Sequence, residues 1–231
     1  VLGDAVTVLM NAAIEPEVVA LCEFLNKAGA KIEGVGCECL KITGVKKLEN
    51  IAYSVPKDRI VAGTYMLAAM ATGGVAELFH PPVKHMKAIL MVTERMGATL
   101  VEGSESLTVI APKRITPVHY LETAVYPGFP TDLQSQLLTC LTQADGQSIV
   151  RETIFENRYK VAEDLKRMGA DIVIKEDVAY ITGKTPLLGH NVTAGELRGG
   201  AALVIAGLVA EGVTIIHNTS YIQRGYEDII R

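Results

Sequence analysis

The residues Tyr-Pro-Gly-Phe-Pro-Thr-Asp at positions 126–132 place a carboxylate directly after a loop stiffened by two prolines. Because prolines and a glycine disfavour regular structure, a helix is predicted to begin only at Thr131 or Asp132. From this stretch alone, the favoured interpretation is that Asp132 caps the helix by accepting backbone N–H groups. The alternative is that the rigid loop aims the Asp132 carboxylate at a ligand.

Three arginines form the second candidate set, namely Arg158, Arg198 and Arg224. Carboxylates such as Glu156 and Glu196 lie near them in the sequence. Guanidinium groups bind phosphates and carboxylates through paired hydrogen bonds, so the three would suit a substrate that carries both groups. Taken singly, each arginine is better explained as a solvated helix-start residue or an ion-pair partner. The interpretation as a shared site depends on polar stretches that recur at predicted helix starts, at residues 129–132, 152–158, 196–200 and 224–227.

The elements that would position these side chains follow a period of about 70 residues. Gly-Ala pairs at residues 29–30, 97–98 and 169–170 each follow an amphipathic stretch and precede a predicted strand, so each glycine is expected just past a helix end. Glycines 74, 146 and 212 each close an apolar helix and open a strand. Each unit therefore reads as helix, strands, helix, strand, which predicts an α/β fold built from a repeated unit around a shared core.

Local patterns predict strands at residues 31–35 and 40–42, a helix over residues 60–71, and a domain boundary near Pro56. From there on, the second helix of each repeat starts with an acid, at Asp58, Asp132 and Glu196. Three equivalent helix N-termini are predicted to gather around one axis, where they would attract anions. Both ends of the sequence cut through a repeat, and a helix is predicted to begin at Gly225, so the sequence reads as part of a longer chain.

Composition narrows the class of partners. The 231 residues are 49% hydrophobic and 21% charged, with a net charge of −4, so bulk charge does not favour nucleic-acid or membrane binding. The longest apolar run, residues 201–210, is too short to span a bilayer and predicts a buried helix. Four scattered cysteines form no disulfide framework, and neither they nor the five histidines have zinc-site spacing, so no metal site is predicted.

Several longer motifs make the sequence resemble the UDP-N-acetylglucosamine 1-carboxyvinyltransferases, a branch of the enolpyruvyl transferase family. Pro-Gly-Phe-Pro-Thr-Asp together with Thr-Ile-Phe-Glu-Asn-Arg separates this branch from the related shikimate-branch transferases. The resemblance runs nearly end to end without large gaps. It is carried by residues 11–17, 58–60, 62–64, 126–132, 152–158 and 224–226.

The resemblance implies a fold of two domains, each an inside-out α/β barrel of three repeats around a pseudo-threefold axis, with the active site between them. Residues 1–57 would be the last part of the first domain, on the nucleotide-sugar side. Residues 58–231 would be most of the second domain without its final segment, so about three of six repeats are present. The absent N-terminal half would hold the family's Lys-Asn pair and a mobile loop with a reactive cysteine, which none of the four cysteines matches.

The resemblance also implies a reaction. Family members transfer the enolpyruvyl group of phosphoenolpyruvate to the 3-hydroxyl of UDP-N-acetylglucosamine and release phosphate, in the first committed step of peptidoglycan synthesis for the cell wall. The reaction is an addition followed by an elimination, it takes place in the cytoplasm, and it needs no metal or organic cofactor. A partial copy of such an enzyme is expected to be inactive alone.

Site residues carry over from the family by motif. Asp132 matches the general base that contacts the sugar 3-hydroxyl, and the backbone at Ile154 matches the position that meets the nucleotide-sugar. Arg224, with Asp132, is assigned to catalysis, because it and Arg198 match arginines around phosphoenolpyruvate. Glu196 stands where the family has aspartate, and Gln223 stands where it has an acid. The implied substrate-binding residues are Asp58, Asp132, Ile154, Glu156, Arg158, Glu196, Arg198 and Arg224.

Two other interpretations stay open. A shikimate-branch transferase shares the fold and mechanism, although the run Thr-Ile-Phe-Glu-Asn-Arg argues against it. A non-catalytic binding or scaffold fragment is the alternative from a different class, and the absent half keeps it open. A Lys-Asn pair and a glycine-rich, cysteine-bearing loop in the flanking coding sequence would favour the enzyme.

Overall fold

The computed structural model describes residues 1–227 and 229. The chain divides into two compact units, each of which is described by itself. The smaller unit comprises Val1–Lys57 and Val125–Pro127, and the larger comprises Asp58–Ala124 and Gly128–Arg231. Among the described residues, no helix combines the length and the apolar character needed to cross a membrane.

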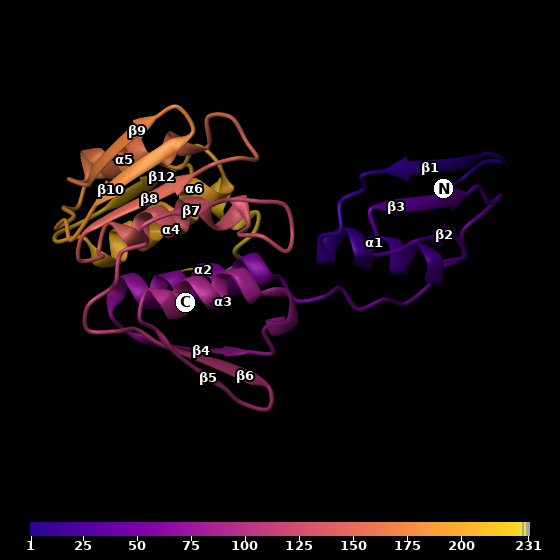
Figure 1. Cartoon of the computed structure of the whole chain (residues 1–231), viewed down its shortest axis with the longest axis horizontal. Helices are drawn as coiled ribbons and strands as arrows, with labels where there is room; N and C mark the ends of the chain where they lie inside the picture. Colours follow the sequence, from indigo (N-terminus) through magenta and orange to yellow (C-terminus); the bar gives the residue numbers. More distant parts are fainter. Residues whose placement is uncertain (228, 230–231) are drawn as a thin grey trace. The chain divides into compact units, whose positions relative to one another are not determined.

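The smaller unit is a three-stranded antiparallel sheet with one helix packed against it (Figure 1). The strand order is β1-β3-β2. Its core is small and consists of Cys22, Ala30, Ile32 and Leu40, with partly buried neighbours around them. The elements are β1 (Val6–Met10), α1 (Pro16–Lys27), β2 (Lys31–Glu33) and β3 (Cys39–Thr43).

Strand β1 is an edge strand of this sheet and is exposed along its whole length. Val8 is 53% exposed and Met10 is 73% exposed. Apolar edge strands with unpaired backbone groups tend to pair with other chains. We therefore expect the isolated chain to self-associate, with a sedimentation coefficient that rises with protein concentration.

Val8→Glu should reduce this self-association, because a charge on an edge strand opposes strand pairing. Val8 lies directly opposite Lys41, so the new carboxylate also has a favourable cross-strand neighbour. The matched control is Val55→Glu, which adds the same charge at an exposed position outside the strands. A wild-type chain that sediments as a monomer at all concentrations would contradict the expectation.

Three helices that pack against one another form the centre of the larger unit. They are α2 (Arg59–Thr72), α4 (Gln134–Leu141) and α6 (Leu197–Val209). All eight residues of α4 are buried, including Gln134, Ser135, Gln136 and Thr139. A helix buried on every side lies at the centre of a fold rather than on its surface.

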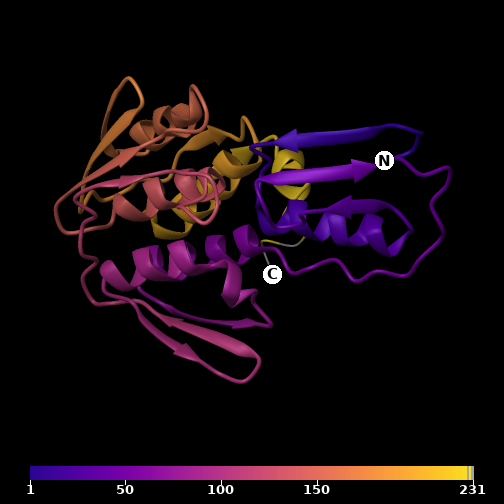
Figure 2. The same cartoon turned by 45° about the vertical axis from the view of Figure 1, so that its right-hand side comes forward.

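Sheets lie outside these helices, so that the helices occupy the interior (Figure 1, Figure 2). One sheet has the order β4-β6-β5, a second has the order β7-β8-β10-β9, and a third pairs β11 with β12. The strands are β4 (Val75–Phe79), β5 (Thr99–Glu102), β6 (Ser106–Ile110), β7 (Leu121–Glu122), β8 (Gln147–Arg151), β9 (Asp171–Lys175), β10 (Val178–Thr182), β11 (Asn191–Thr193) and β12 (Ile215–His217). The remaining helices are α3 (Lys87–Arg95), α5 (Val161–Arg167), the short α7 (Ser220–Gln223) and the 3₁₀ turns η1 (Val83–His85), η2 (Thr131–Leu133) and η3 (Arg158–Lys160). The α/β repeat architecture predicted from the sequence is confirmed.

The glycines of the repeat end their helices as predicted. Gly29, Gly97 and Gly169 follow the C-caps of α1, α3 and α5, with φ angles of 99°, 99° and 101°. Glycine takes positive φ without the steric cost that a side chain would add. The same backbone turn thus recurs once in each repeat.

The prediction that a helix begins at Gly225 is wrong for the described residues. The structure has instead the short helix α7, which ends at Gln223 with Arg224 as its C-cap. Residues 224–225 form a turn. The end of the predicted helix, at residues 228, 230 and 231, lies outside the described residues.

Candidate active site

Asp132 lies in the 3₁₀ turn η2, between the extended Pro130 and helix α4. Its carboxylate caps neither helix, so the favoured interpretation from the local sequence was wrong. Instead, Oδ1 accepts a hydrogen bond from Arg158 Nη2 at 2.7 Å, and Oδ2 accepts one from Arg198 Nη2 at 2.9 Å. Each guanidinium carries a full positive charge, which a backbone N–H lacks, so an ion pair with two arginines can replace the cap at Asp132.

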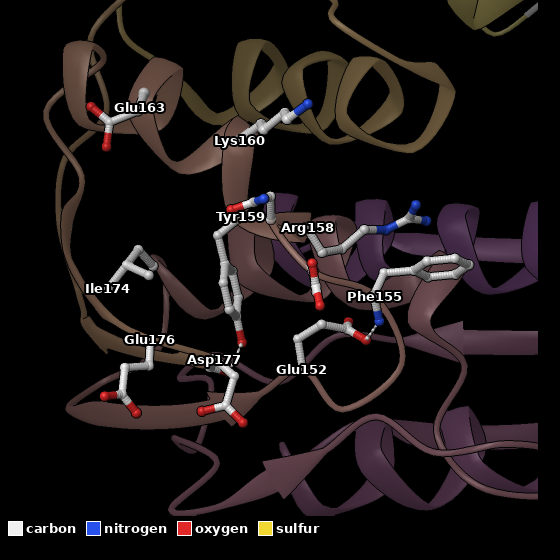
Figure 3. Close-up of a pocket in the computed structure, with 11 residues that line it drawn as sticks. Glu152, Phe155, Arg158, Tyr159, Lys160, Glu163, Ile174, Glu176 and Asp177 are labelled. Atoms are coloured by element: carbon white, nitrogen blue, oxygen red, sulfur yellow. Dashed lines mark hydrogen bonds between the residues drawn. The ribbon is translucent and has the colours of Figure 1, made fainter.

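Arg158 begins the turn η3, directly after Asn157, which has a φ of 57°. The guanidinium of Arg158 lies 5.4 Å from the centre of the Phe155 ring, which Figure 3 shows beside it. Its side chain is 18% exposed, whereas that of Asp132 is 38% exposed. Arg158 Nε is buried and has no hydrogen-bond partner in the described part of the chain. The aromatic ring and the carboxylate together restrict this arginine.

Arg198 lies in the first turn of α6, and Glu196 holds that turn in place. The Glu196 carboxylate caps the helix by accepting hydrogen bonds from the backbone N–H groups of Arg198, at 2.8 Å, and Gly199. The Arg198 side chain is only 14% exposed. Burial alone lowers the pKa of Arg198, but the attraction and hydrogen bonds of Asp132 and Tyr226 outweigh it and raise that pKa.

The other end of the Arg198 fork contacts a buried polar junction between the central helices. Arg198 Nη1 lies 3.5 Å from the hydroxyl of Tyr226, and this hydroxyl lies 2.8 Å from Thr64 Oγ1 on α2. Gln136 Nε2 on α4 donates to Thr64 Oγ1 at 3.0 Å and lies 3.4 Å from the Tyr226 hydroxyl. The junction therefore ties α2, α4, α6 and the segment after α7 to one arginine of the cluster. Thr64, Gln136 and Tyr226 are not among the site residues predicted from the sequence, although Thr64 and Tyr226 lie within motifs that carry the resemblance.

Glu152 is a further residue that was not singled out from the sequence, where it appeared only as part of the range 152–158. It follows β8, is 4% exposed, and accepts four hydrogen bonds. Their donors are the hydroxyls of Thr123 and Thr131 and the backbone N–H groups of Ile154 and Phe155, at 2.8, 2.9, 2.8 and 3.1 Å. It opens a polar run in the sequence, which is the one signal that pointed toward it.

The loop after Glu152 lines a pocket of 550 Å³ (Figure 3). Glu156 and Arg158 are among the lining residues, and Ile154, which is 38% exposed, belongs to the same loop. Acidic side chains line the pocket at Glu163, Glu176 and Asp177, with Lys160 as a basic one.

The remaining predicted residues have different surroundings. Asp58 caps α2 by accepting from the N–H groups of Ile60, at 2.6 Å, and Val61, at 3.0 Å. Arg224 is exposed at the C-terminal end of α7, two residues before Tyr226. Of the three acids expected at equivalent helix starts, Asp58 and Glu196 cap their helices and Asp132 does not. The repeat has thus left one acid available to bind two arginines.

Three of the four cysteines lie in the smaller unit, and Cys140 lies in the larger one. All four thiols are free, and Cys140 lies in α4, where burial raises its pKa to about 12. A thiol is nucleophilic as the thiolate, so burial disfavours the reactive form of Cys140. The part of the chain that the structure describes contains no group of three His, Cys, Asp or Glu residues that could hold a metal ion.

Known relatives are similar to this sequence over almost its whole length. The chain is 46% identical over 228 residues to UDP-N-acetylglucosamine 1-carboxyvinyltransferase 2 of Caldanaerobacter subterraneus subsp. tengcongensis, covering 99% of this chain and 55% of that protein. It is 46% identical over 227 residues to UDP-N-acetylglucosamine 1-carboxyvinyltransferase of Halothermothrix orenii, covering 98% of this chain and 54% of that protein. The chain thus spans about half the length of these relatives.

Solved structures show the same fold. The crystal structure of the enolpyruvyl transferase NikO from Streptomyces tendae matches with a TM-score of 0.87 at 24% identity, over 99% of this chain and 55% of that chain. EPSP synthase from Acinetobacter baumannii matches with a TM-score of 0.72 at 21% identity, over 98% of this chain and 55% of that chain. The family model of EPSP synthase (3-phosphoshikimate 1-carboxyvinyltransferase) matches residues 1–231. The chain therefore belongs to the EPSP synthase family of enolpyruvyl transferases.

Proposed function

We propose that this chain supplies part of the active site of a cytoplasmic enzyme that transfers the enolpyruvyl group of phosphoenolpyruvate to the 3-hydroxyl of UDP-N-acetylglucosamine. The observation that carries the proposal is the clamp on Asp132, whose two carboxylate oxygens are bound by Arg158 and Arg198. A carboxylate and two guanidinium groups at one place supply a proton acceptor beside cations for an anionic substrate. The names of the relatives favour this acceptor sugar.

In the proposed reaction, the sugar hydroxyl attacks C2 of phosphoenolpyruvate and loses its proton to Asp132. A proton adds to C3, which becomes a methyl group, and a tetrahedral adduct results. In the second half, the C2–O bond to phosphate breaks, C3 loses a proton, and the double bond forms again. The overall change exchanges phosphate for the sugar oxygen at C2, with no oxidation or reduction.

Each residue of the cluster has a proposed role in these steps. Arg198 and Arg224 hold the phosphate and carboxylate of phosphoenolpyruvate, with Arg158 beside them. Arginine has five N–H donors, so Arg158 and Arg198 retain donors for an anion while each gives one to Asp132. Arg224 is exposed, so a ligand can reach its side chain.

Other residues are proposed to bind the nucleotide-sugar or to act through the helix N-termini that they cap. The backbone of Ile154 contacts the nucleotide-sugar, with Glu156 in the same loop. Asp58 and Glu196 contribute through the helix N-termini that they cap. We further propose that residues 1–57 are the last part of a first domain and residues 58–231 most of a second. On this reading, a complete site needs a segment that the relatives have and this sequence lacks.

Transfer to a shikimate-type acceptor is the second candidate, because the matching family model carries the name of that enzyme. The two candidates share the same chemistry at phosphoenolpyruvate. They differ in the acceptor, so a direct comparison of acceptors decides between them.

The test uses an assembled enzyme, in which this chain replaces the aligned 228 residues of the Caldanaerobacter relative. Phosphate release is measured with phosphoenolpyruvate and either UDP-N-acetylglucosamine or 3-phosphoshikimate. We expect release with the nucleotide-sugar alone, and none from this chain without the added segments. Release with 3-phosphoshikimate would favour the second candidate. A folded assembled enzyme that acts on neither acceptor would overturn the proposed function.

A further inference from the structure

We propose that Glu152 is a positioning residue, which fixes the spacing between the segment that carries Asp132 and the segment that carries Ile154. This inference rests on the proposed function, since it concerns two groups assigned to the same reaction. Glu152 contacts neither substrate in the proposal. Its role is to hold two loops, both of which follow strands of one sheet.

The hydrogen bonds of Glu152 divide between the two segments. Oε2 accepts from the hydroxyl of Thr131, the residue directly before Asp132, at 2.9 Å. Oε1 accepts from the backbone N–H groups of Ile154, at 2.8 Å, and Phe155, at 3.1 Å. One carboxylate therefore connects the turn η2 to the loop that precedes η3. The two segments are more than twenty residues apart in the sequence, as the separation of 21 between Thr131 and Glu152 indicates.

Thr123, which follows β7, bonds to both Glu152 and the loop after it. Its hydroxyl donates to Glu152 Oε1 at 2.8 Å and accepts from the backbone N–H of Thr153 at 2.9 Å. The carbonyl of Thr123 accepts from the hydroxyl of Thr153, and its N–H donates to the carbonyl of Arg151 at 2.9 Å. These contacts tie the residue after β7 to the last residue of β8 and to the two residues that follow it.

Burial makes this carboxylate a rigid linker. Glu152 is 4% exposed, and a buried carboxylate is costly unless its lone pairs are satisfied. Four donors satisfy them, and two of these are backbone groups that cannot rotate away. A displacement of about 1 Å in a reacting group costs about a hundredfold in rate, so a linker of this kind has a kinetic consequence.

Kinetics of the assembled enzyme test the proposal. We expect Glu152→Ala to lower kcat by about tenfold and to raise KM for UDP-N-acetylglucosamine by about tenfold, because each segment loses a charge-assisted hydrogen bond. Glu152→Gln should recover most of both losses, since its amide oxygen can replace Oε1 and its NH₂ can donate to Thr131. Thr131→Val cuts only the link toward Asp132, so it should lower kcat without changing that KM.

Thr93→Val is the matched control, because it removes a buried hydroxyl that donates to the carbonyls of Ile89 and Leu90 in its own helix, α3. It should leave both constants unchanged. In the Asp132→Asn background, Thr131→Val should lose its effect on kcat, since it acts through Asp132. Equal constants for Glu152→Ala and wild type, measured on folded protein, would overturn the proposal. So would a Glu152→Gln variant as impaired as Glu152→Ala.

Hydrogen exchange separates this proposal from the proposed function. The amides of Ile154 and Phe155 should exchange about tenfold faster in Glu152→Ala than in wild type, and at the wild-type rate in Glu152→Gln and Thr93→Val. This readout does not depend on turnover. An assembled enzyme without activity but with this exchange pattern would defeat the proposed function and leave the linkage supported. Unchanged exchange in Glu152→Ala would defeat the linkage itself.

Discussion

Asp132→Asn is expected to lower kcat of the assembled enzyme by about a hundredfold or more while leaving the affinity for UDP-N-acetylglucosamine largely intact. A general base contributes on the order of a hundredfold to ten-thousandfold, and an amide cannot accept the hydroxyl proton. The amide oxygen can still accept from one arginine. The NH₂ group of the new amide would face the N–H donors of the second arginine, so one of the two contacts with Arg158 and Arg198 is lost.

The matched control for this variant is Asp145→Asn. The Asp145 side chain is 38% exposed, as is that of Asp132, and it also pairs with an arginine, since its Oδ2 lies 3.1 Å from Arg114 Nε. Turnover should be unchanged in the control. Pre-steady-state measurement of phosphate release distinguishes slow chemistry from slow product release. A single-turnover rate equal to that of wild type would remove Asp132 from the role of base.

The repeat architecture could be predicted from the sequence because its signals are local. Gly29, Gly97 and Gly169 each stop a helix at a positive φ, and such a stop depends on few neighbours. The same holds for Asp58 and Glu196, whose carboxylates bond to backbone N–H groups two and three residues ahead. A pattern confined to one turn of helix is visible before the chain folds.

The clamp on Asp132 could not be predicted from its own neighbourhood. Locally, Asp132 has the same pattern as the two capping acids, so the cap was the better interpretation. Its partners Arg158 and Arg198 lie 26 and 66 residues away, and only the packed repeats bring them together. Non-local ion pairs of this kind depend on tertiary structure, which a single sequence does not display.

Glu152 and Tyr226 were missed for a related reason. Burial gives each residue its role, since Glu152 is 4% exposed and Tyr226 is 2% exposed, and burial at a single position is not visible in the sequence. The Tyr226 hydroxyl meets Thr64 and Gln136 only because three helices converge. Motif comparison assigned Arg224 to substrate binding and catalysis, and this assignment stays a prediction; the structure shows Arg224 exposed at the C-cap of α7.

Arg198→Ala is expected to have the largest effect, a loss of about a thousandfold in kcat/KM for phosphoenolpyruvate. It removes a charge-assisted bond to Asp132 and, in the proposed function, another to the substrate, and each is worth roughly 1.5–3 kcal/mol. Arg198→Lys keeps the charge but loses the fork that reaches Asp132 and Tyr226 together, so we expect an intermediate loss of about tenfold or more.

A double-mutant cycle tests whether Arg198 acts partly through Asp132. In the Asp132→Asn background, Arg198→Ala should cost about tenfold less than it does in wild type, because groups in contact share their interaction energy. The parallel cycle on Asp145 and Arg114, an ion pair whose arginine is 87% exposed, should show additivity. Additive losses at Asp132 and Arg198 would mean that the two residues do not interact functionally, so that the arginine serves the substrate alone. Strong coupling would instead mean that one guanidinium both holds the base in place and binds the anion on which it acts.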